Sequence, residues 1–96
     1  MPKGYVVATI NVTDPEKWAE YAKDASEAIR KYGGRPLVRG GKHVPLEGQP
    51  GARNVVIEFD SLDQAVTYFN SPEYQAAKAK REGAGTGHFV AVEGAA

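Results

Sequence analysis

Side chains alternate between two faces along the first patterned segment of the chain, residues 4–12. A period of two is typical of a β-strand, because successive side chains point to opposite sides of a sheet. One face is purely apolar and consists of Val6, Ala8, Ile10 and Val12. The other face mixes apolar and polar groups: Tyr5, Val7, Thr9 and Asn11. We expect the apolar face to pack against helices.

The period changes to that of a helix in the next segment. Its apolar residues recur at alternating steps of four and three: Trp18, Ala22, Ala25, Ile29 and Tyr32. Asp14 followed by Pro15 predicts the start of this helix, because Asp caps a helix and Pro fits its first position. Thr13 with Glu16 could instead form a capping box. Gly33-Gly34 predicts the end of the helix.

Three more strands are predicted, at residues 35–39, 53–60 and 88–93. These segments are rich in the β-branched and aromatic residues that favour extended structure. Pro36 indicates an edge position for the first of them, because proline cannot donate a hydrogen bond to a neighbouring strand. Residues 40–52 are rich in glycine and proline, so we expect a loop or a protruding hairpin there.

The second helical region is interrupted. Ser61-Leu62-Asp63-Gln64 has the capping-box pattern, and the apolar stripe that follows it extends to Phe69. Asn70-Ser71-Pro72 ends this helix. Ser71 can cap, and Pro72 can begin, a further helix that continues to Arg81. The glycines that follow predict the end of that helix: Gly83, Gly85 and Gly87.

The resulting order, β-α-β-β-α-β, is typical of an α+β protein with the ferredoxin-like fold, a four-stranded antiparallel sheet with helices on one face. Right-handed crossovers give the strand order 4-1-3-2. The other face of the sheet carries Val7, Leu37 and Val56, which are too apolar to remain in water. We therefore expect a homodimer in which a second copy packs sheet against sheet about a two-fold axis.

Composition narrows the possible partners. The 96 residues favour a single domain over residues 1–96, and the absence of cysteine excludes disulfides and thiolate catalysis. Lys+Arg and Asp+Glu balance at 12 each, so no net field attracts nucleic acid or an anionic membrane. The apolar runs are far shorter than the ~20 residues that span a membrane. The first residues lack the apolar core of a signal peptide, and we expect a cytoplasmic protein.

Seven short segments carry a family resemblance: Gly4-Tyr5, Thr13-Asp14-Pro15, Tyr32-Gly33-Gly34, Leu37-Val38-Arg39-Gly40-Gly41, Leu46-Glu47-Gly48, Val56-Ile57-Glu58-Phe59 and Ser71-Pro72-Glu73-Tyr74-Gln75. In this order, over nearly the whole chain, they resemble the family called domain of unknown function 1330, of the dimeric α/β barrel superfamily. The resemblance implies a ferredoxin-like protomer and a homodimer with a barrel between its sheets. It implies no reaction. Superfamily relatives include cofactor-independent monooxygenases, haem-degrading enzymes, small isomerases and stress-responsive proteins.

Arg39 and Glu58 are the first candidates for catalysis. Their strands are neighbours in the expected order, and alternation places Glu58 with Val56, and Arg39 with Leu37, on the barrel face. A charged pair in an apolar cavity is costly unless it is hydrogen-bonded or hydrated. Arg39 would orient a carboxylate or enolate, and Glu58 would act as acid, base or orienting partner. The alternative is a structural ion pair that anchors the dimer or the following loop.

Five further residues are candidates for ligand binding: Thr9, Asn11, Tyr21, Arg81 and His88. By alternation Thr9 and Asn11 point into the barrel, where they would bond a ligand or water. Tyr21 either reaches the cavity edge as a phenol donor or packs under the second helix. Arg81 either clamps a carboxylate at the subunit boundary or pairs with an acid there. His88 would lie at the barrel rim, where a haem would need an axial ligand.

These patterns predict a small-molecule pocket in a dimeric barrel. One hypothesis is an enzyme without a bound cofactor, which carries out proton transfer or oxygenation on a small organic acid or aromatic compound. The alternative is a non-catalytic homodimer that binds a metabolite or has a stress-related role. We expect no metal site, because the chain has no ligand cluster with the usual spacing. Gly40-Gly41 precedes no helix, so the nucleotide-binding pattern is weak.

Overall fold

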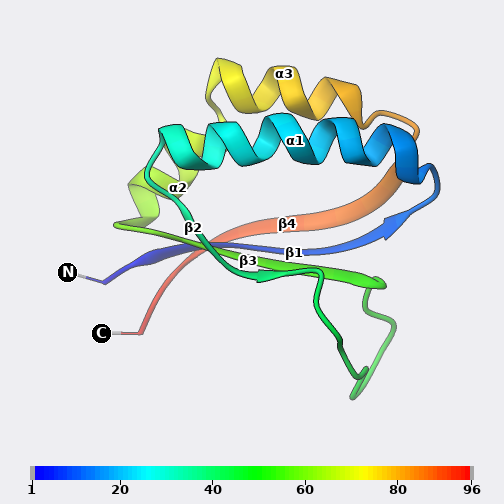
Figure 1. Cartoon of the computed structure of the whole chain (residues 1–96). Helices are drawn as coiled ribbons and strands as arrows, with labels where there is room; N and C mark the ends of the chain where they lie inside the picture. The colour runs from blue at the N-terminus through cyan, green and yellow to red at the C-terminus, as the bar shows by residue number, and fades with distance from the viewer. Residues whose placement is uncertain (1, 96) are drawn as a thin grey trace.

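The computed structural model describes residues 2–95, which form two layers (Figure 1). One layer is an antiparallel sheet with the strand order β2-β3-β1-β4. Its strands are β1 (Gly4–Val12), β2 (Arg35–Arg39), β3 (Arg53–Phe59) and β4 (Gly85–Glu93). The helices are α1 (Pro15–Lys31), α2 (Leu62–Phe69) and α3 (Pro72–Lys80), and all of them lie on the same face of the sheet (Figure 1).

This arrangement confirms the predicted ferredoxin-like α+β fold and its strand order. β2 is an edge strand, as Pro36 indicated. The predicted caps are also present. Asp14 caps α1 by accepting a hydrogen bond of 3.2 Å from the backbone N–H of Lys17, and Ser61 and Ser71 cap α2 and α3 in the same way. Local capping chemistry therefore fixes where each helix begins.

The last strand is longer than predicted, because β4 begins at Gly85 rather than at His88. The glycine run predicted a helix end, yet Gly85 and Gly87 pair with residues of β1. A β-carbon at Gly85 would collide with the backbone carbonyl oxygen of Asn11. Glycine at this position permits a close approach of β4 to β1. In the sequence, such a glycine looks the same as one that ends a helix.

A β-bulge in β2 changes which side chains share a face. Arg35 pairs with Glu58 on β3, but the register shifts between Pro36 and Val38. Leu37 is the extra residue, so Arg39 pairs with Val55. The bulge reverses the alternation that would have kept Arg35 and Arg39 on one side of the sheet. The prediction that Arg39 and Glu58 share the barrel face is therefore wrong.

Aromatic side chains fill much of the space between the two layers. The largest fully buried side chains are Phe59, Tyr68 and Tyr74. The ring centroids of Phe59 and Tyr68 are 5.0 Å apart, and those of Tyr68 and Tyr74 are 4.9 Å apart. These are favourable separations for aromatic pairs. Tyr74 belongs to α3, so the break at Ser71-Pro72 is what brings α3 back over the core.

The face of the sheet opposite the helices has no covering layer within residues 2–95. We call it the open face. Val38, Val90 and Val92 on this face are 42%, 56% and 46% exposed. The loop of residues 40–52 extends on the same side of the sheet (Figure 1), and its Leu46 is 93% exposed. An apolar sheet face and an apolar loop tip therefore lie on one side of the molecule.

Glu73, in the first turn of α3, joins this helix to the end of α1. Its carboxylate accepts a hydrogen bond of 2.7 Å from the Tyr32 hydroxyl and forms an ion pair with Lys31. These two contacts lower the pKa of Glu73 to about 2 from its ordinary value of 4.5, with Lys31 as the larger cause. The ionised form of Glu73 thus favours the packing of α3 against α1.

We expect Glu73→Gln to lower the free energy of unfolding at neutral pH. A carboxyl group with a depressed native pKa contributes stability above its unfolded pKa and loses that contribution as the pH falls through its native pKa. The difference between the wild type and Glu73→Gln should therefore shrink between about pH 4.5 and pH 2. Urea denaturation at a series of pH values measures it. Glu16→Gln, on an exposed side chain of α1, is the control, and a pH-independent difference for Glu73→Gln would contradict the assignment.

Candidate functional site

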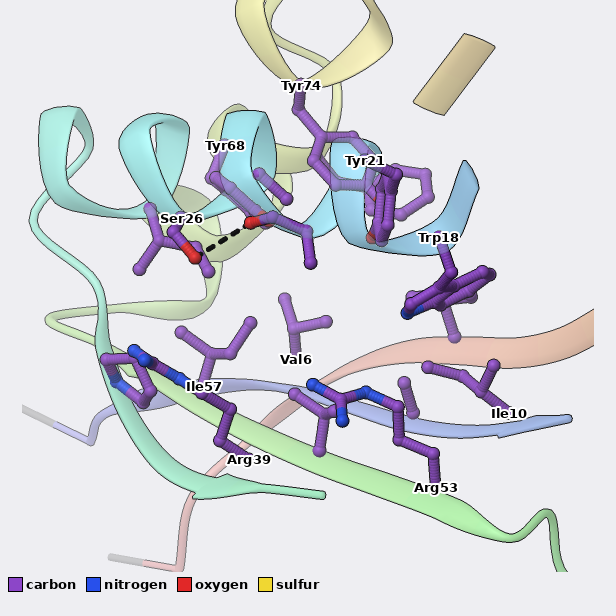
Figure 2. Close-up of a pocket in the computed structure, with 18 residues that line it drawn as sticks. Val6, Ile10, Trp18, Tyr21, Ser26, Arg39, Arg53, Ile57, Tyr68 and Tyr74 are labelled. Atoms are coloured by element: carbon purple, nitrogen blue, oxygen red, sulfur yellow. Dashed lines mark hydrogen bonds between the residues drawn. The ribbon is translucent and has the colours of Figure 1, made fainter. Parts of the chain in front are cut away.

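A cavity of about 80 Å³ lies between the helices and the sheet (Figure 2). Its walls are mainly apolar and come from all four strands and all three helices. Val6 and Ile57 form part of the sheet side, while Ala25 and Tyr68 form part of the helix side. A cavity needs roughly 10–15 Å³ to hold one water molecule, so this one has room for a small organic group.

Two arginines line the cavity on its sheet side, Arg39 at the end of β2 and Arg53 at the start of β3 (Figure 2). Arg53 pairs with Ile10 in the sheet, and Arg39 pairs with Val55, so both side chains are on the helix side. Neither arginine forms an ion pair or a side-chain hydrogen bond with residues 2–95 of the chain. No Asp or Glu is among the lining residues. The cavity is therefore apolar in its interior and cationic at one edge.

Trp18 supplies a further donor. Its side chain is 5% exposed, and its Nε1 is buried without a hydrogen-bond partner in the described part of the chain. Figure 2 shows this nitrogen turned toward the space above Arg53. An unpartnered buried N–H costs about 1–3 kcal/mol, so it marks a position where a bound acceptor would be favourable.

Tyr21 also lines the cavity, and it packs against α3 rather than reaching a barrel edge. Its hydroxyl lies 2.8 Å from that of Tyr74. Burial raises the pKa of Tyr21, so the phenol is neutral at physiological pH. Arg81 lies beside this pair, with its guanidinium 5.1 Å from the centre of the Tyr21 ring and 4.6 Å from that of Phe89. Arg81 thus contacts aromatic rings, and no acid within residues 2–95 pairs with it.

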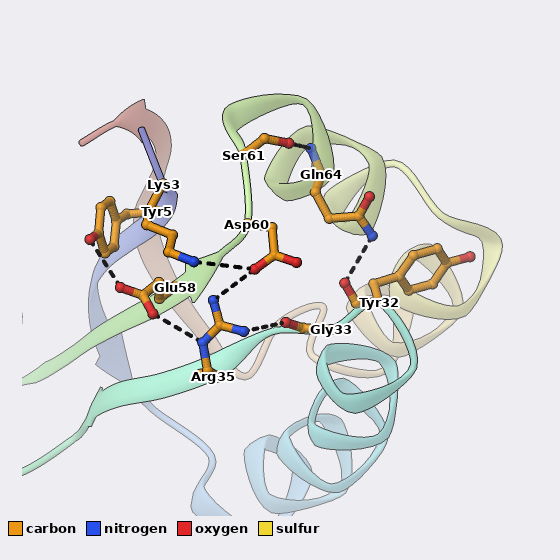
Figure 3. Close-up of polar contacts among 9 residues, drawn as sticks. All are labelled: Lys3, Tyr5, Tyr32, Gly33, Arg35, Glu58, Asp60, Ser61 and Gln64. Atoms are coloured by element: carbon orange, nitrogen blue, oxygen red, sulfur yellow. Dashed lines mark hydrogen bonds and ion pairs between the residues drawn. The ribbon is translucent and has the colours of Figure 1, made fainter. Parts of the chain in front are cut away.

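Glu58 lies on the open face, where its partner is Arg35 (Figure 3). Arg35 Nε donates to the Glu58 carboxylate at 3.0 Å, and the Tyr5 hydroxyl donates at 3.1 Å. Arg35 also donates to Asp60 at 3.2 Å, and Lys3 pairs with Asp60 at 3.4 Å. Arg35, followed by Tyr5, holds the pKa of Glu58 below its usual value. The predicted Arg39–Glu58 pair does not form, because the bulge places Arg39 on the other side of the sheet.

Near the same end of the sheet, Gln64 departs from the capping-box prediction. Its backbone N–H donates to the Ser61 hydroxyl at 3.1 Å, as in any capped helix. Its side chain instead donates to the backbone carbonyl of Tyr32 at 2.8 Å (Figure 3). Gln64 therefore ties α2 to the end of α1, rather than completing the reciprocal bond to Ser61.

The polar residues of β1 hold the end of the 40–52 loop. Thr9 Oγ1 accepts a hydrogen bond of 2.5 Å from the backbone N–H of Gly51, and Asn11 Oδ1 accepts one of 3.2 Å from that of Ala52. These acceptors therefore bond the backbone of the loop, which is neither of the partners expected from the sequence, a ligand or water. His88 lies opposite Thr9 on the open face and is exposed, and His43 is exposed in the loop.

Sequence reasoning missed Arg53, Trp18 and Arg35 as site residues. Alternation alone could have found Arg53, because it shares the parity of Val55 and Ile57 on the helix-facing side of β3. Trp18 belongs to the apolar stripe predicted for the first helix and is buried, but its free Nε1 depends on the packing around it. Arg35 could not be preferred over Arg39 without knowledge of the bulge.

A second hollow, of about 120 Å³, lies between α2 and β4. Val6, Phe69 and Phe89 line both this hollow and the cavity. Their side chains therefore form the wall between the two spaces. The remaining residues around the second hollow include Val66 and Asn70 of the α2 end and Val90 of β4.

Residues 2–95 contain no group of three or more His, Cys, Asp or Glu side chains arranged to hold a metal ion. Within the same range, no helix has the length and apolar character needed to cross a membrane. The cytoplasmic location expected from the sequence stays a prediction.

Fold and cavity together define a small ferredoxin-like α+β protein with a hollow between its helices and its sheet. The sequence pattern of DUF1330, a domain of unknown function, matches residues 3–95, and the chain therefore belongs to this family. The family resemblance noted in the sequence is confirmed. None of the curated proteins matches the chain in sequence.

Solved structures show the same fold. RPA0582 of Rhodopseudomonas palustris, a protein of unknown function, has a TM-score of 0.71 at 16% identity, covering 99% of this chain and 84% of that chain. A dimeric ferredoxin-like protein of unknown function from Bacteroides fragilis has a TM-score of 0.57 at 18% identity, covering 95% of each chain. SnoaB, a cofactor-independent oxygenase from Streptomyces nogalater, has a TM-score of 0.63 at 9% identity, covering 100% and 96%.

We expect Arg35→Met to raise the pKa of Glu58 toward its ordinary value, because Arg35 is the main cause that lowers it. Arg39→Met is the matched control, since it removes the same charge from the opposite side of the sheet. Titration of the Glu58 carboxyl carbon by NMR measures both variants. An equal shift in both variants would contradict the assignment of Arg35 as the particular partner of Glu58.

Proposed function

We propose that the protein binds a small organic molecule in the cavity between its helices and its sheet. The observation that carries this proposal is the cavity itself, an apolar space of about 80 Å³ with unpaired donors at its edge. Protein interiors are normally filled to the density of organic crystals. A hollow lined by apolar walls and a few convergent polar groups is the usual form of a ligand site.

The open face supports ligand binding less well. Glu58 already accepts hydrogen bonds from Arg35 and Tyr5, and the side-chain oxygens of Thr9 and Asn11 accept bonds from the loop. An acid–base role for Glu58 would require a ligand held between the two sheets of a dimer. The catalytic roles predicted for Arg39 and Glu58 therefore no longer belong to one site, and we place the ligand beside Arg39.

A cavity-filling variant tests this proposal. Ala22 lines the cavity from α1, so Ala22→Phe should remove the thermal stabilisation that small aromatic and aliphatic acids give to the wild type. A ligand at about a hundred times its dissociation constant adds about 2.7 kcal/mol to the free energy of unfolding. Thermal unfolding with a set of such compounds measures the effect.

Ala19→Phe is the control for this experiment, because Ala19 is exposed on the same helix and does not line the cavity. It should keep the full stabilisation. If Ala22→Phe and Ala19→Phe were stabilised equally, the ligand would bind elsewhere and the proposal would fail.

We also propose a homodimer formed through the open face. The exposed valines of β2 and β4 on this face, together with the exposed Leu46 of the loop, support it. A structurally similar protein from Bacteroides fragilis is described as dimeric. Packing of one open face on a second copy would remove these apolar groups from water, a gain of about 25 cal/mol for each Å² of apolar surface.

The dimer is tested by sedimentation at micromolar concentration. Val90→Lys places a charge among the exposed valines of the open face and should shift the protein toward the monomer. Val66→Lys is the control, because Val66 is exposed on α2, on the helix side of the molecule. A monomeric wild type, or equal dissociation of both variants, would contradict the proposed interface.

A second candidate function is cofactor-independent oxygenation of the bound molecule. Its support is the fold shared with SnoaB, a cofactor-independent oxygenase. In this candidate Arg39 stabilises negative charge that develops on the substrate. The lining residues include no Asp, Glu, His or Lys to act as base, and this favours binding without turnover. Product analysis and oxygen uptake in the ligand titrations distinguish the two functions, since only the oxygenase consumes dioxygen.

A further inference from the structure

We infer that the ligand of the cavity is a small carboxylate with an apolar, ring-sized body, held by Arg39 and Arg53 together with Trp18 Nε1. This inference rests on the proposed function and adds the chemical class of the ligand. The apolar walls would enclose the body of the molecule, and its carboxylate would lie at the cationic edge.

The surroundings of the two arginines support an anion at this edge. Lys3, Lys31, Arg35 and Lys80 form ion pairs with carboxylates, and the remaining lysines and arginines of residues 2–95 do not. Arg39 and Arg53 lie in the same cavity, and neither has such a partner within residues 2–95. Both border an apolar cavity, where a bound carboxylate would balance their charge.

The backbone makes room for one of these guanidinium groups. Gly40 has a φ of 65°. A β-carbon at this position would collide with Nη1 of Arg53. Arg53 is therefore packed against the backbone of the turn that follows β2, which brings it beside the end of the strand that carries Arg39. A guanidinium held in this way can present its planar fork to a carboxylate with little loss of side-chain freedom.

Trp18 is the independent observation that points to a ligand. Its Nε1 is buried, has no partner and is turned toward the cavity (Figure 2). The cavity thus offers N–H donors from three side chains. A carboxylate is an acceptor with two oxygens and several lone pairs, so it can accept hydrogen bonds from more than one of these donors.

The size and walls of the cavity define the body of the ligand. About 80 Å³ corresponds to roughly five to eight water positions, which limits the ligand to about one ring or a short branched chain. Tyr68, Phe69 and Phe89 contribute aromatic walls. Inorganic anions would leave these walls unfilled, so we expect an organic acid rather than phosphate to bind.

Benzoate and benzamide form a matched pair of probes, because they share shape and differ in charge. We expect the wild type to bind benzoate at least tenfold more tightly than benzamide, as measured by NMR titration, and to show no saturable binding of inorganic phosphate. Arg39→Met and Arg53→Met keep much of the apolar stem and remove the charge, so each should weaken benzoate binding about tenfold or more. Trp18→Phe removes only the indole donor and should weaken it several-fold. None of these variants should weaken the binding of benzamide as much as the binding of benzoate.

Arg30→Met is the control, since Arg30 is exposed on α1 and does not line the cavity. Equal binding of benzoate and benzamide that Ala22→Phe abolishes would overturn the inference and leave the proposed function standing. If neither compound bound in the cavity, both would fail. Tighter binding of phosphate than of benzoate would also overturn the inference, because it would assign the arginines to an inorganic anion.

Discussion

A four-stranded sheet has two faces, and this chain supplies helices for only one of them. Every other feature follows from which side chain lies on which face. The helix side holds the aromatic core and the cavity, while the open face holds exposed valines and a network of ion pairs. Because alternation decides the face, one extra residue in a strand redistributes charge between two different environments.

That extra residue is Leu37. It keeps Arg35 with Glu58 on the open face and transfers Arg39 to the helix side. A regular β2 would have concentrated both arginines and the acid on the open face and left the cavity with one guanidinium fewer. The 40–52 loop that follows β2 is likewise held by residues distant in sequence, because Thr9 and Asn11 accept hydrogen bonds from its end.

Local chemistry explains how much the sequence could predict. The alternation along β1 and β3, the caps at Asp14, Ser61 and Ser71, and the edge position signalled by Pro36 are each set within a few residues, and all agree with the structure. The candidate site was predicted less well, because it depends on register. Tyr21 and Arg39 do line a cavity, but that cavity lies between the helices and the sheet rather than inside a barrel. The free Nε1 of Trp18 is a property of packing in three dimensions, so no pattern of residue types could reveal it.

The wall between the cavity and the second hollow has a consequence for the range of molecules that could enter. Val6 is a buried sheet residue, whereas Phe69 and Phe89 are partly buried rings whose side-chain torsions can change without a change of the backbone. Rotation of these two rings would join the two spaces and enlarge the chamber toward β4. The orientation of these two rings would then set the largest ligand that the cavity can hold. Related chains with smaller side chains at these two positions would accept longer ligands on the same backbone.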